Sequence, residues 1–97
     1  MEIKKTATAG TAESSDIMVI IKKNEQEGNS ISLQSSVEKQ FGAQIRATIE
    51  AVLEKFDIHN AQIQAIDQGA LDCTIQARMT TAVLRACELS TLDLGEL

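Results

Sequence analysis

Two adjacent serines, Ser14 and Ser15, lie between the carboxylates of Glu13 and Asp16. The stretch that holds them consists of small, turn-forming residues and runs directly into the most apolar segment of the chain, residues 17–21. Both hydroxyls are therefore expected at the surface, on a turn that precedes a strand. Because no base is near them in sequence, the pattern favours covalent modification by a partner over catalysis by a serine.

The size of the chain limits what it can enclose. Its 97 residues suffice for one hydrophobic core, but not for a core together with an enclosed active site. No apolar run approaches the roughly 20 residues of a membrane helix, and the N-terminus lacks the apolar segment of a signal peptide. We therefore expect a single domain over residues 1–97, cytoplasmic and without a membrane partner.

The charge balance is acidic, with 14 Asp and Glu against 9 Lys and Arg. A nucleic-acid partner would require a basic face and aromatic stacking platforms, whereas Phe41 and Phe56 are the only Phe, Trp or Tyr residues. The composition therefore argues against nucleic-acid binding. An acidic surface suits docking on basic patches of partner proteins, although a charge of this size also serves simply to keep a small domain soluble.

The thiols and the imidazole suggest no catalytic or metal site. Cys73 and Cys87 are too far apart in sequence for a Cys-x-x-Cys motif. On one helix, a rise of ~1.5 Å per residue would separate them by roughly 21 Å, beyond the reach of a disulfide. We expect two buried or half-buried thiols, and we expect His59, the single histidine, in a loop.

Hydrophobic patterns predict three strands and a possible fourth. Residues 6–13 form a weak first strand, and the β-branched residues 16–23 form a strong second one. Residues 30–35 alternate between apolar and polar side chains, and residues 61–67 do so more weakly.

A helix is expected between the last two strands. Ser35 and Glu38 have the spacing of a capping box, and Arg46 and Glu50 have that of an ion pair on the outer face. One apolar stripe at steps of three and four residues is expected to face the core: Phe41, Ile45, Ile49, Val52, Leu53 and Phe56.

The C-terminal part of the chain fits two patterns. Residues 71–77 alternate as a strand would, yet they also fit a helix that continues into the alanine-rich residues 77–86. We favour one helix over residues 70–88, followed by a flexible acidic tail at residues 89–97.

These elements predict an α+β fold, a small sheet of three to four strands with two helices packed on one face and a hairpin at the N-terminus. The order strand, helix, strand implies a right-handed crossover to a parallel neighbour. The strand at residues 17–21 is apolar on both sides. Its second side is expected to be covered by a partner subunit, which we favour, or by local packing.

Three blocks of sequence resemble the acyl carrier protein of bacterial citrate lyase, the gamma chain, in the same order and spacing from about residue 9 to residue 86. The blocks are Ala9-Gly10-Thr11 with Glu13, Ser14 and Asp16; Ser36-Val37-Glu38-Lys39-Gln40-Phe41-Gly42; and Asp67 with Gly69-Ala70-Leu71-Asp72-Cys73 and Ala77-Arg78. The Asp-Ser-Leu signature of the four-helix carriers of fatty acid synthesis is absent.

The resemblance implies a non-catalytic carrier in which Ser14 holds 2'-(5''-phosphoribosyl)-3'-dephospho-coenzyme A through a phosphodiester. The implied partners are the alpha subunit, which exchanges acetyl for citrate on the thiol of this arm, the beta subunit, which cleaves the citryl thioester to oxaloacetate, and the prosthetic-group transferase. Members of the family often have glycine where this chain has Ser15, and a serine is tolerable there if its φ stays negative. Asp16 is expected to brace the turn through bonds to nearby amides.

Two alternatives stay open. One is a carrier of the malonate decarboxylase type, which the same resemblance allows. The other is a structural or adaptor subunit that docks through residues 17–21 and carries no covalent group.

Overall fold

The computed structural model describes residues 2–88, and the predicted tail at residues 89–97 lies outside them. Within the described residues, the chain forms four strands and two helices. Their bounds are β1 Ala7–Gly10, β2 Ile17–Lys23, β3 Ser30–Ser35, α1 Glu38–Lys55, β4 Ala61–Asp67 and α2 Asp72–Ala86. No helix in this part of the chain is long and apolar enough to cross a membrane.

The four strands form one sheet in the order β1-β2-β4-β3. β1 and β2 are an antiparallel hairpin, and β2 pairs antiparallel with β4. β3 and β4 are parallel neighbours that are joined through α1, which confirms the predicted crossover to a parallel strand. The sheet is therefore mixed, and its only parallel pair is the one that needs a helix to connect it.

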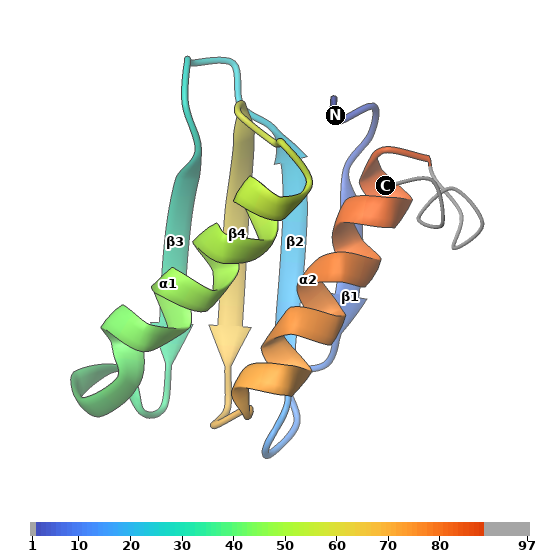
Figure 1. Ribbon diagram of the computed structural model, residues 1–97. Helices are drawn as coiled ribbons and strands as arrows, with labels where there is room; N and C mark the ends of the chain where they lie inside the picture. The colour runs from blue at the N-terminus through green and yellow to red at the C-terminus, as the bar shows by residue number, and fades with distance from the viewer. Residues whose placement is uncertain (1, 89–97) are drawn as a thin grey trace.

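Both helices pack on the same face of the sheet, as Figure 1 shows. The residues of β2 and β4 that point toward them are fully buried, among them Ile17, Val19, Ile21 and Ile63. Ile49 from α1 and Met79 from α2 meet this face and are equally buried. The predicted α+β fold with two helices on one face and an N-terminal hairpin is confirmed.

The other face of the sheet has a small apolar centre. Met18 and Ile20 of β2 point away from the helices and are half-buried. Met18 pairs with Ile66 of β4, and Ile20 pairs with Gln64. The cover of this face by a partner subunit stays a prediction.

The predicted capping box is wrong. α1 begins at Glu38 with Val37 as its N-cap residue, and no side chain caps it. The Ser35 hydroxyl donates instead to Asp67 Oδ2 at 2.7 Å, and it accepts from the Val37 amide at 3.1 Å. A partner 32 residues away has thus taken the hydroxyl that the local pattern assigned to the helix.

The apolar stripe of α1 is buried except at its first member. Ile45, Ile49, Val52, Leu53 and Phe56 all belong to the core, as predicted. Phe41, in contrast, is 47% exposed.

The expected pair of Arg46 with Glu50 is replaced by other contacts. The Arg46 guanidinium donates to the carbonyl oxygen of Ile31 on β3 at 2.9 Å, and it lies 3.9 Å from Glu38. The side chain therefore ties α1 to the sheet edge.

A single helix occupies the ambiguous C-terminal region, which confirms the favoured alternative to within two residues at each end. Both cysteines are free. Cys87 is buried, and its burial raises the pKa of the thiol. Cys73 is exposed, so the expectation of a buried or half-buried thiol is wrong there. His59 lies in the loop between α1 and β4, as expected.

Asp67 is the one charged side chain buried in the described residues, with 1% of it exposed. Besides the Ser35 hydroxyl, its carboxylate accepts the amides of Gly69 at 3.1 Å and Ala70 at 3.0 Å. The side chain therefore joins the β3–α1 loop to the β4–α2 loop at the end of the sheet where both helices begin (Figure 1).

Replacement of Asp67 by alanine is expected to lower the free energy of unfolding by about 3 kcal/mol or more. Hydrogen bonds to a charged group contribute about 1.5–3 kcal/mol each, and three donors would lose their acceptor inside the protein. Urea denaturation followed by circular dichroism measures the change. Asp72→Ala, at the same end of the fold, is the control and should cost less than about 1 kcal/mol. Equal losses for the two variants would contradict this role of Asp67.

Candidate functional site

The loop between β1 and β2, residues 11–16, presents the two serines. Both are exposed, and they are the central residues of a turn closed by the Asp16 amide, which donates to the Glu13 carbonyl at 3.1 Å. Ser15 has φ 64°, whereas Ser14 does not have a positive φ. This combination is typical of a type II turn.

The turn continues into a β-bulge against β4. The Ser15 amide donates to the Gln68 carbonyl at 2.7 Å, and the Gln68 amide donates to the Asp16 carbonyl at 2.9 Å. Two residues of the hairpin thus lie opposite one residue of the β4 side, the arrangement of a G1 bulge. The turn is held directly on the sheet.

The Asp16 carboxylate braces the loop from inside. Its Oδ2 accepts the Thr11 hydroxyl at 2.7 Å and the Thr11 amide at 3.2 Å, and its Oδ1 accepts the Ile17 amide at 2.8 Å. These bonds join the first residue of the loop to the last. The predicted turn-bracing role of Asp16 is confirmed.

Arg78 from the second turn of α2 completes the brace. Its Nε donates to Asp16 Oδ1 and its Nη2 donates to Asp16 Oδ2, both at 3.0 Å, which is the bidentate geometry that guanidinium and carboxylate favour. The Arg78 hydrogen bonds, followed by those from Thr11 and Ile17, hold the pKa of Asp16 well below its usual range. The Asp16 carboxylate in turn raises the pKa of Arg78.

Gly10 allows this brace to form. Its φ is +84°, and a Cβ at this position would lie 1.9 Å from the Ile17 carbonyl oxygen and 3.1 Å from Cδ of Arg78. A side chain here would therefore push apart the two ends of the loop and the arginine that spans them.

Ser15 does not have the negative φ that was expected for a serine at this position. Its φ is 64°, in the left-handed region that favours glycine. The first residue of a G1 bulge is usually glycine for the same reason. The serine therefore carries local backbone strain.

Sequence reasoning found Ser14, Ser15 and Asp16, and the structure brings all three onto one turn. It did not assign roles to Arg78 or Asp67. The alternation in β4 could have identified Asp67, because it follows Ala61, Ile63 and Ala65 at the positions that face the core. Arg78 belongs to a block of the family resemblance, but no local pattern pointed to its partner, which is 62 residues away.

Arg78→Met is expected to lower the Tm by several degrees at pH 7, and this deficit should become smaller in acid. Because the folded state lowers the pKa of Asp16, the pair adds stability above the usual aspartate pKa of about 3.9 and loses it as the pH falls further. Thermal unfolding of both proteins between pH 7 and pH 2.5 measures this convergence.

Arg85→Met is the matched control, since it removes the same charge from α2 without touching Asp16; the Arg85 Nη1 donates to the Thr8 carbonyl at 2.8 Å. Its deficit in Tm should persist in acid. A deficit for Arg78→Met that stays constant over the whole pH range would refute the coupling.

Ser15→Gly is expected to raise the free energy of unfolding by about 0.5–1 kcal/mol, because glycine adopts a positive φ without steric cost. For a domain of this size, 1 kcal/mol corresponds to roughly 4–8 °C in Tm. Ser14→Gly should give no such gain, since the φ of Ser14 is not positive and glycine only adds entropy to the unfolded chain. A Tm below that of the parent for Ser15→Gly would contradict the strain.

Residues 4–86 match a family model described as the malonate decarboxylase delta subunit (MdcD). The chain is 50% identical over all 97 residues to the citrate lyase acyl carrier protein of Streptococcus mutans, with 95% of that protein covered. The proteins of the same name from Latilactobacillus sakei and Lacticaseibacillus casei are 54% and 56% identical, over the same shares of both chains.

Solved structures share the fold at low sequence identity. A chain of a Pseudomonas malonate decarboxylase hetero-tetramer crystallised with malonate has a TM-score of 0.71 at 17% identity, covering 86% of this chain and 84% of that one. Homoserine kinase from Cytophaga hutchinsonii has a TM-score of 0.54 at 13% identity, covering 88% of this chain and 35% of the kinase. The family model and the whole-length relatives both describe subunits of acyl-carrying enzyme complexes. At 50–56% identity over its whole length, the chain belongs to the family of citrate lyase acyl carrier proteins, which are carrier subunits and not catalysts.

Proposed function

We propose that this chain is the acyl carrier of a cytoplasmic citrate lyase and that Ser14 Oγ holds 2'-(5''-phosphoribosyl)-3'-dephospho-coenzyme A. The observation that carries the proposal is the exposed Ser14 on a braced turn, in a chain about half identical to citrate lyase carriers along its whole length. The terminal thiol of the bound arm supplies the thioester on which acetyl and citryl groups travel.

The geometry around Ser14 fits an attachment point for a large group. The side chain is exposed at the central position of the turn, so an arm can leave it without displacing the core. The backbone beneath it is held by the Ser15 and Gln68 amides and by the Asp16–Arg78 pair. An arm attached here would start from a fixed point.

The residues near Ser14 do not form a catalytic centre. Both Asp16 oxygens are occupied by hydrogen bonds, and a carboxylate with a lowered pKa is a weak base. Formation of the phosphodiester therefore requires a transferase that removes the Ser14 hydroxyl proton. The Ser14 oxygen then bonds to the phosphorus of the activated arm, and the phosphate leaving group departs from that phosphorus. The chain contributes the oxygen nucleophile and its position.

The carrier is proposed to deliver its thioester to the alpha and beta subunits of citrate lyase, which exchange and cleave the acyl group to give oxaloacetate and acetate. Tethering makes each encounter intramolecular, with effective concentrations in the millimolar range for short flexible linkers. An anchor that does not move preserves this advantage.

A malonate decarboxylase carrier is the second candidate, favoured by the description of the family model and by the structural neighbour. The citrate lyase relatives match the whole chain at about three times the identity of that neighbour, since 50% compares with 17%. Assay of the loaded carrier with purified citrate lyase and malonate decarboxylase subunits distinguishes the two, because only one substrate should be turned over.

The intact mass of the protein from its native host is expected to exceed the sequence mass by one prosthetic group, and Ser14→Ala should remove this increment completely. Ser15→Ala is the matched control and should keep it, because that side chain follows the attachment point in the same turn. Electrospray mass spectrometry of the three proteins is the measurement. An increment that survives Ser14→Ala but disappears in Ser15→Ala would move the site by one residue. A wild-type protein without added mass would instead favour a non-covalent adaptor.

A further inference from the structure

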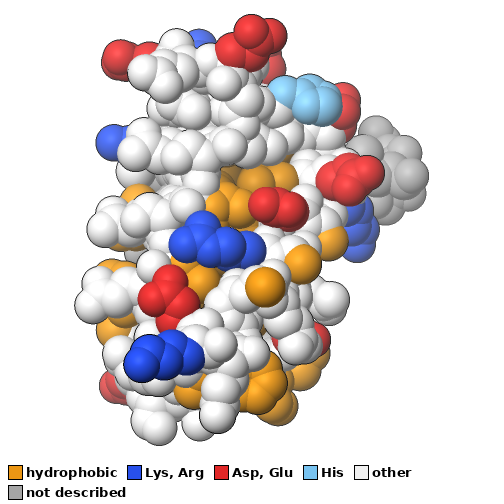
Figure 2. Space-filling model, turned by 90° about the vertical axis from the view of Figure 1, so that its left-hand side faces the viewer, with side chains coloured by type: hydrophobic (Ala, Val, Ile, Leu, Met, Phe, Trp, Pro, Cys, Tyr) orange, Lys and Arg blue, Asp and Glu red, His pale blue; other side chains and the backbone are white. Residues whose placement is uncertain are grey.

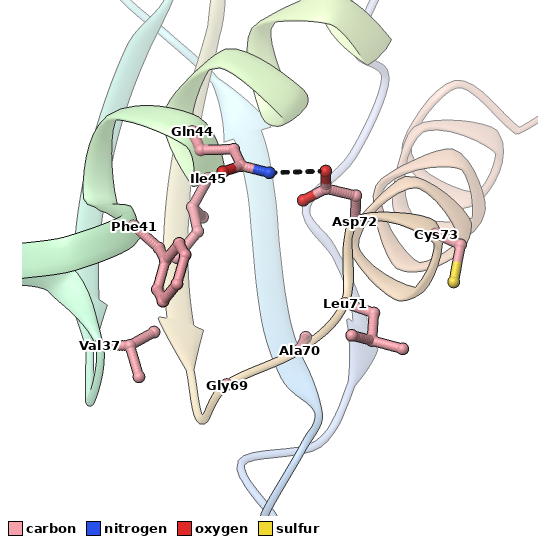
Figure 3. Close-up of a pocket in the computed structure, with 9 residues that line it drawn as sticks. All are labelled: Val37, Phe41, Gln44, Ile45, Gly69, Ala70, Leu71, Asp72 and Cys73. Atoms are coloured by element: carbon pink, nitrogen blue, oxygen red, sulfur yellow. Dashed lines mark hydrogen bonds between the residues drawn. The ribbon is translucent and has the colours of Figure 1, made fainter.

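An apolar groove opens between the first turns of the two helices. Its volume is about 480 Å³, and it is drawn in Figure 3. Val37, Phe41 and Ile45 line the α1 side, and Ala70 and Leu71 lie on the α2 side (Figure 3). The Gln44 amide donates to Asp72 Oδ2 at 2.8 Å and bridges the two helices across the groove.

The groove accounts for the two large hydrophobic side chains that are exposed in residues 2–88. Phe41 is 47% exposed and Leu71 is 71% exposed, and both line this one groove. Figure 2 shows hydrophobic side chains gathered at the lower end of the molecule, the end at which α1 begins. Single exposed hydrophobic residues are ordinary, whereas two on opposite sides of one concavity indicate a binding surface, although the Leu71 side chain extends away from Phe41 in Figure 3.

The groove is joined to the turn that carries Ser14. The Ser15 amide donates to the Gln68 carbonyl, and the next residue, Gly69, lines the groove. Asp67 fixes the amides of Gly69 and Ala70, so this wall is rigid relative to the turn. The loop of the β1–β2 hairpin and the starts of both helices lie at the same end of the sheet (Figure 1).

We propose that the groove is a resting site for the arm attached to Ser14, where it holds the amide-and-hydrocarbon segment next to the thiol together with a small acyl thioester. This inference rests on the proposed function. Its chemistry fits because the lining is mostly apolar, with Gln44, Asp72 and the free thiol of Cys73 as the other groups. Such a lining suits short hydrocarbon segments interrupted by amides.

The size of the groove favours the arm over a protein partner. A volume near 480 Å³ is within the ~300–1,000 Å³ of small-molecule sites. The arm also starts from the adjacent loop. A protein partner in the groove is the alternative that the experiments below must exclude.

Tethering makes weak binding sufficient. A groove that binds the free arm with a Kd of about 1 mM would be about half occupied at an effective concentration on the order of 1 mM. Half occupancy leaves the arm free for the partner subunits half of the time. In the groove the thioester would be shielded from water between the two reactions.

Magnetic resonance of the isotope-labelled protein tests the proposal directly. On passing from the unmodified protein to the acetylated carrier, signals of Phe41, Ile45 and Leu71 should shift, while Ile20 and Ile66 on the open sheet face should not. Shifts confined to residues 11–16 would overturn the proposal. Groove shifts that appear only when citrate lyase subunits are added would also overturn it, since they would indicate a protein occupant.

Free S-acetylpantetheine separates this inference from the proposed function. Titration of this compound into the unmodified protein should shift the signals of the same three residues at millimolar concentrations. This result does not depend on whether Ser14 is the attachment site in the native host. A missing mass increment on Ser14 would refute the proposed function alone. A full mass increment without any groove shift would refute the resting site alone.

Variants provide a kinetic test. Leu71→Gln should abolish the shifts of Phe41 and make hydrolysis of the acetyl thioester about twofold faster, the factor expected from half occupancy. Ile20→Thr, an apolar-to-polar change on the opposite face of the sheet, should leave both measurements as in the parent. Equal hydrolysis rates for Leu71→Gln and the parent would contradict shielding by the groove.

Discussion

The carboxylate of Asp16 is the group on which the geometry of the candidate site depends. Hydrophobic packing of two helices on the sheet stabilises the domain, but it is non-directional and cannot orient a loop that extends beyond the core. Asp16 supplies direction, because its two oxygens accept from Thr11, Ile17 and Arg78 at 2.7–3.2 Å. The loop, β2 and α2 therefore meet at one ionised group.

Asp67 has the corresponding role for the other two loops at this end of the sheet. Its carboxylate joins Ser35, before α1, to Gly69 and Ala70, before α2. It is buried, yet each of its oxygens has a donor, which is the condition for a buried carboxylate to be tolerated. Two acidic residues at adjoining strand ends thus make three loops into one rigid surface. The hairpin turn and the groove are both parts of that surface.

The sequence allowed the elements to be predicted wherever one repeating pattern applied. The bounds of β3 and β4 were found to the residue, because alternation in a half-buried strand is a local property. Two failures reflect how distant parts of the chain meet: Ser35 bonds Asp67 instead of capping α1, and Phe41 lines a groove instead of the core. The exposed turn at Ser14 followed from local composition, whereas its brace from Arg78 depends on how α2 crosses the sheet, which no spacing in the chain reveals.

The strain at Ser15 has its physical origin in two hydrogen bonds that the turn must form together. A residue with positive φ in the turn lets the Asp16 amide close on Glu13 while the Ser15 amide still reaches Gln68. Without that conformation the turn could form the bond within the hairpin or the bond to Gln68 on the sheet, but not both. A mobile attachment point would let an attached arm sample a larger volume, and its effective concentration at each partner site would be lower. The local cost of about 1 kcal/mol at Ser15 is therefore offset by bonds that keep the neighbouring hydroxyl in one position.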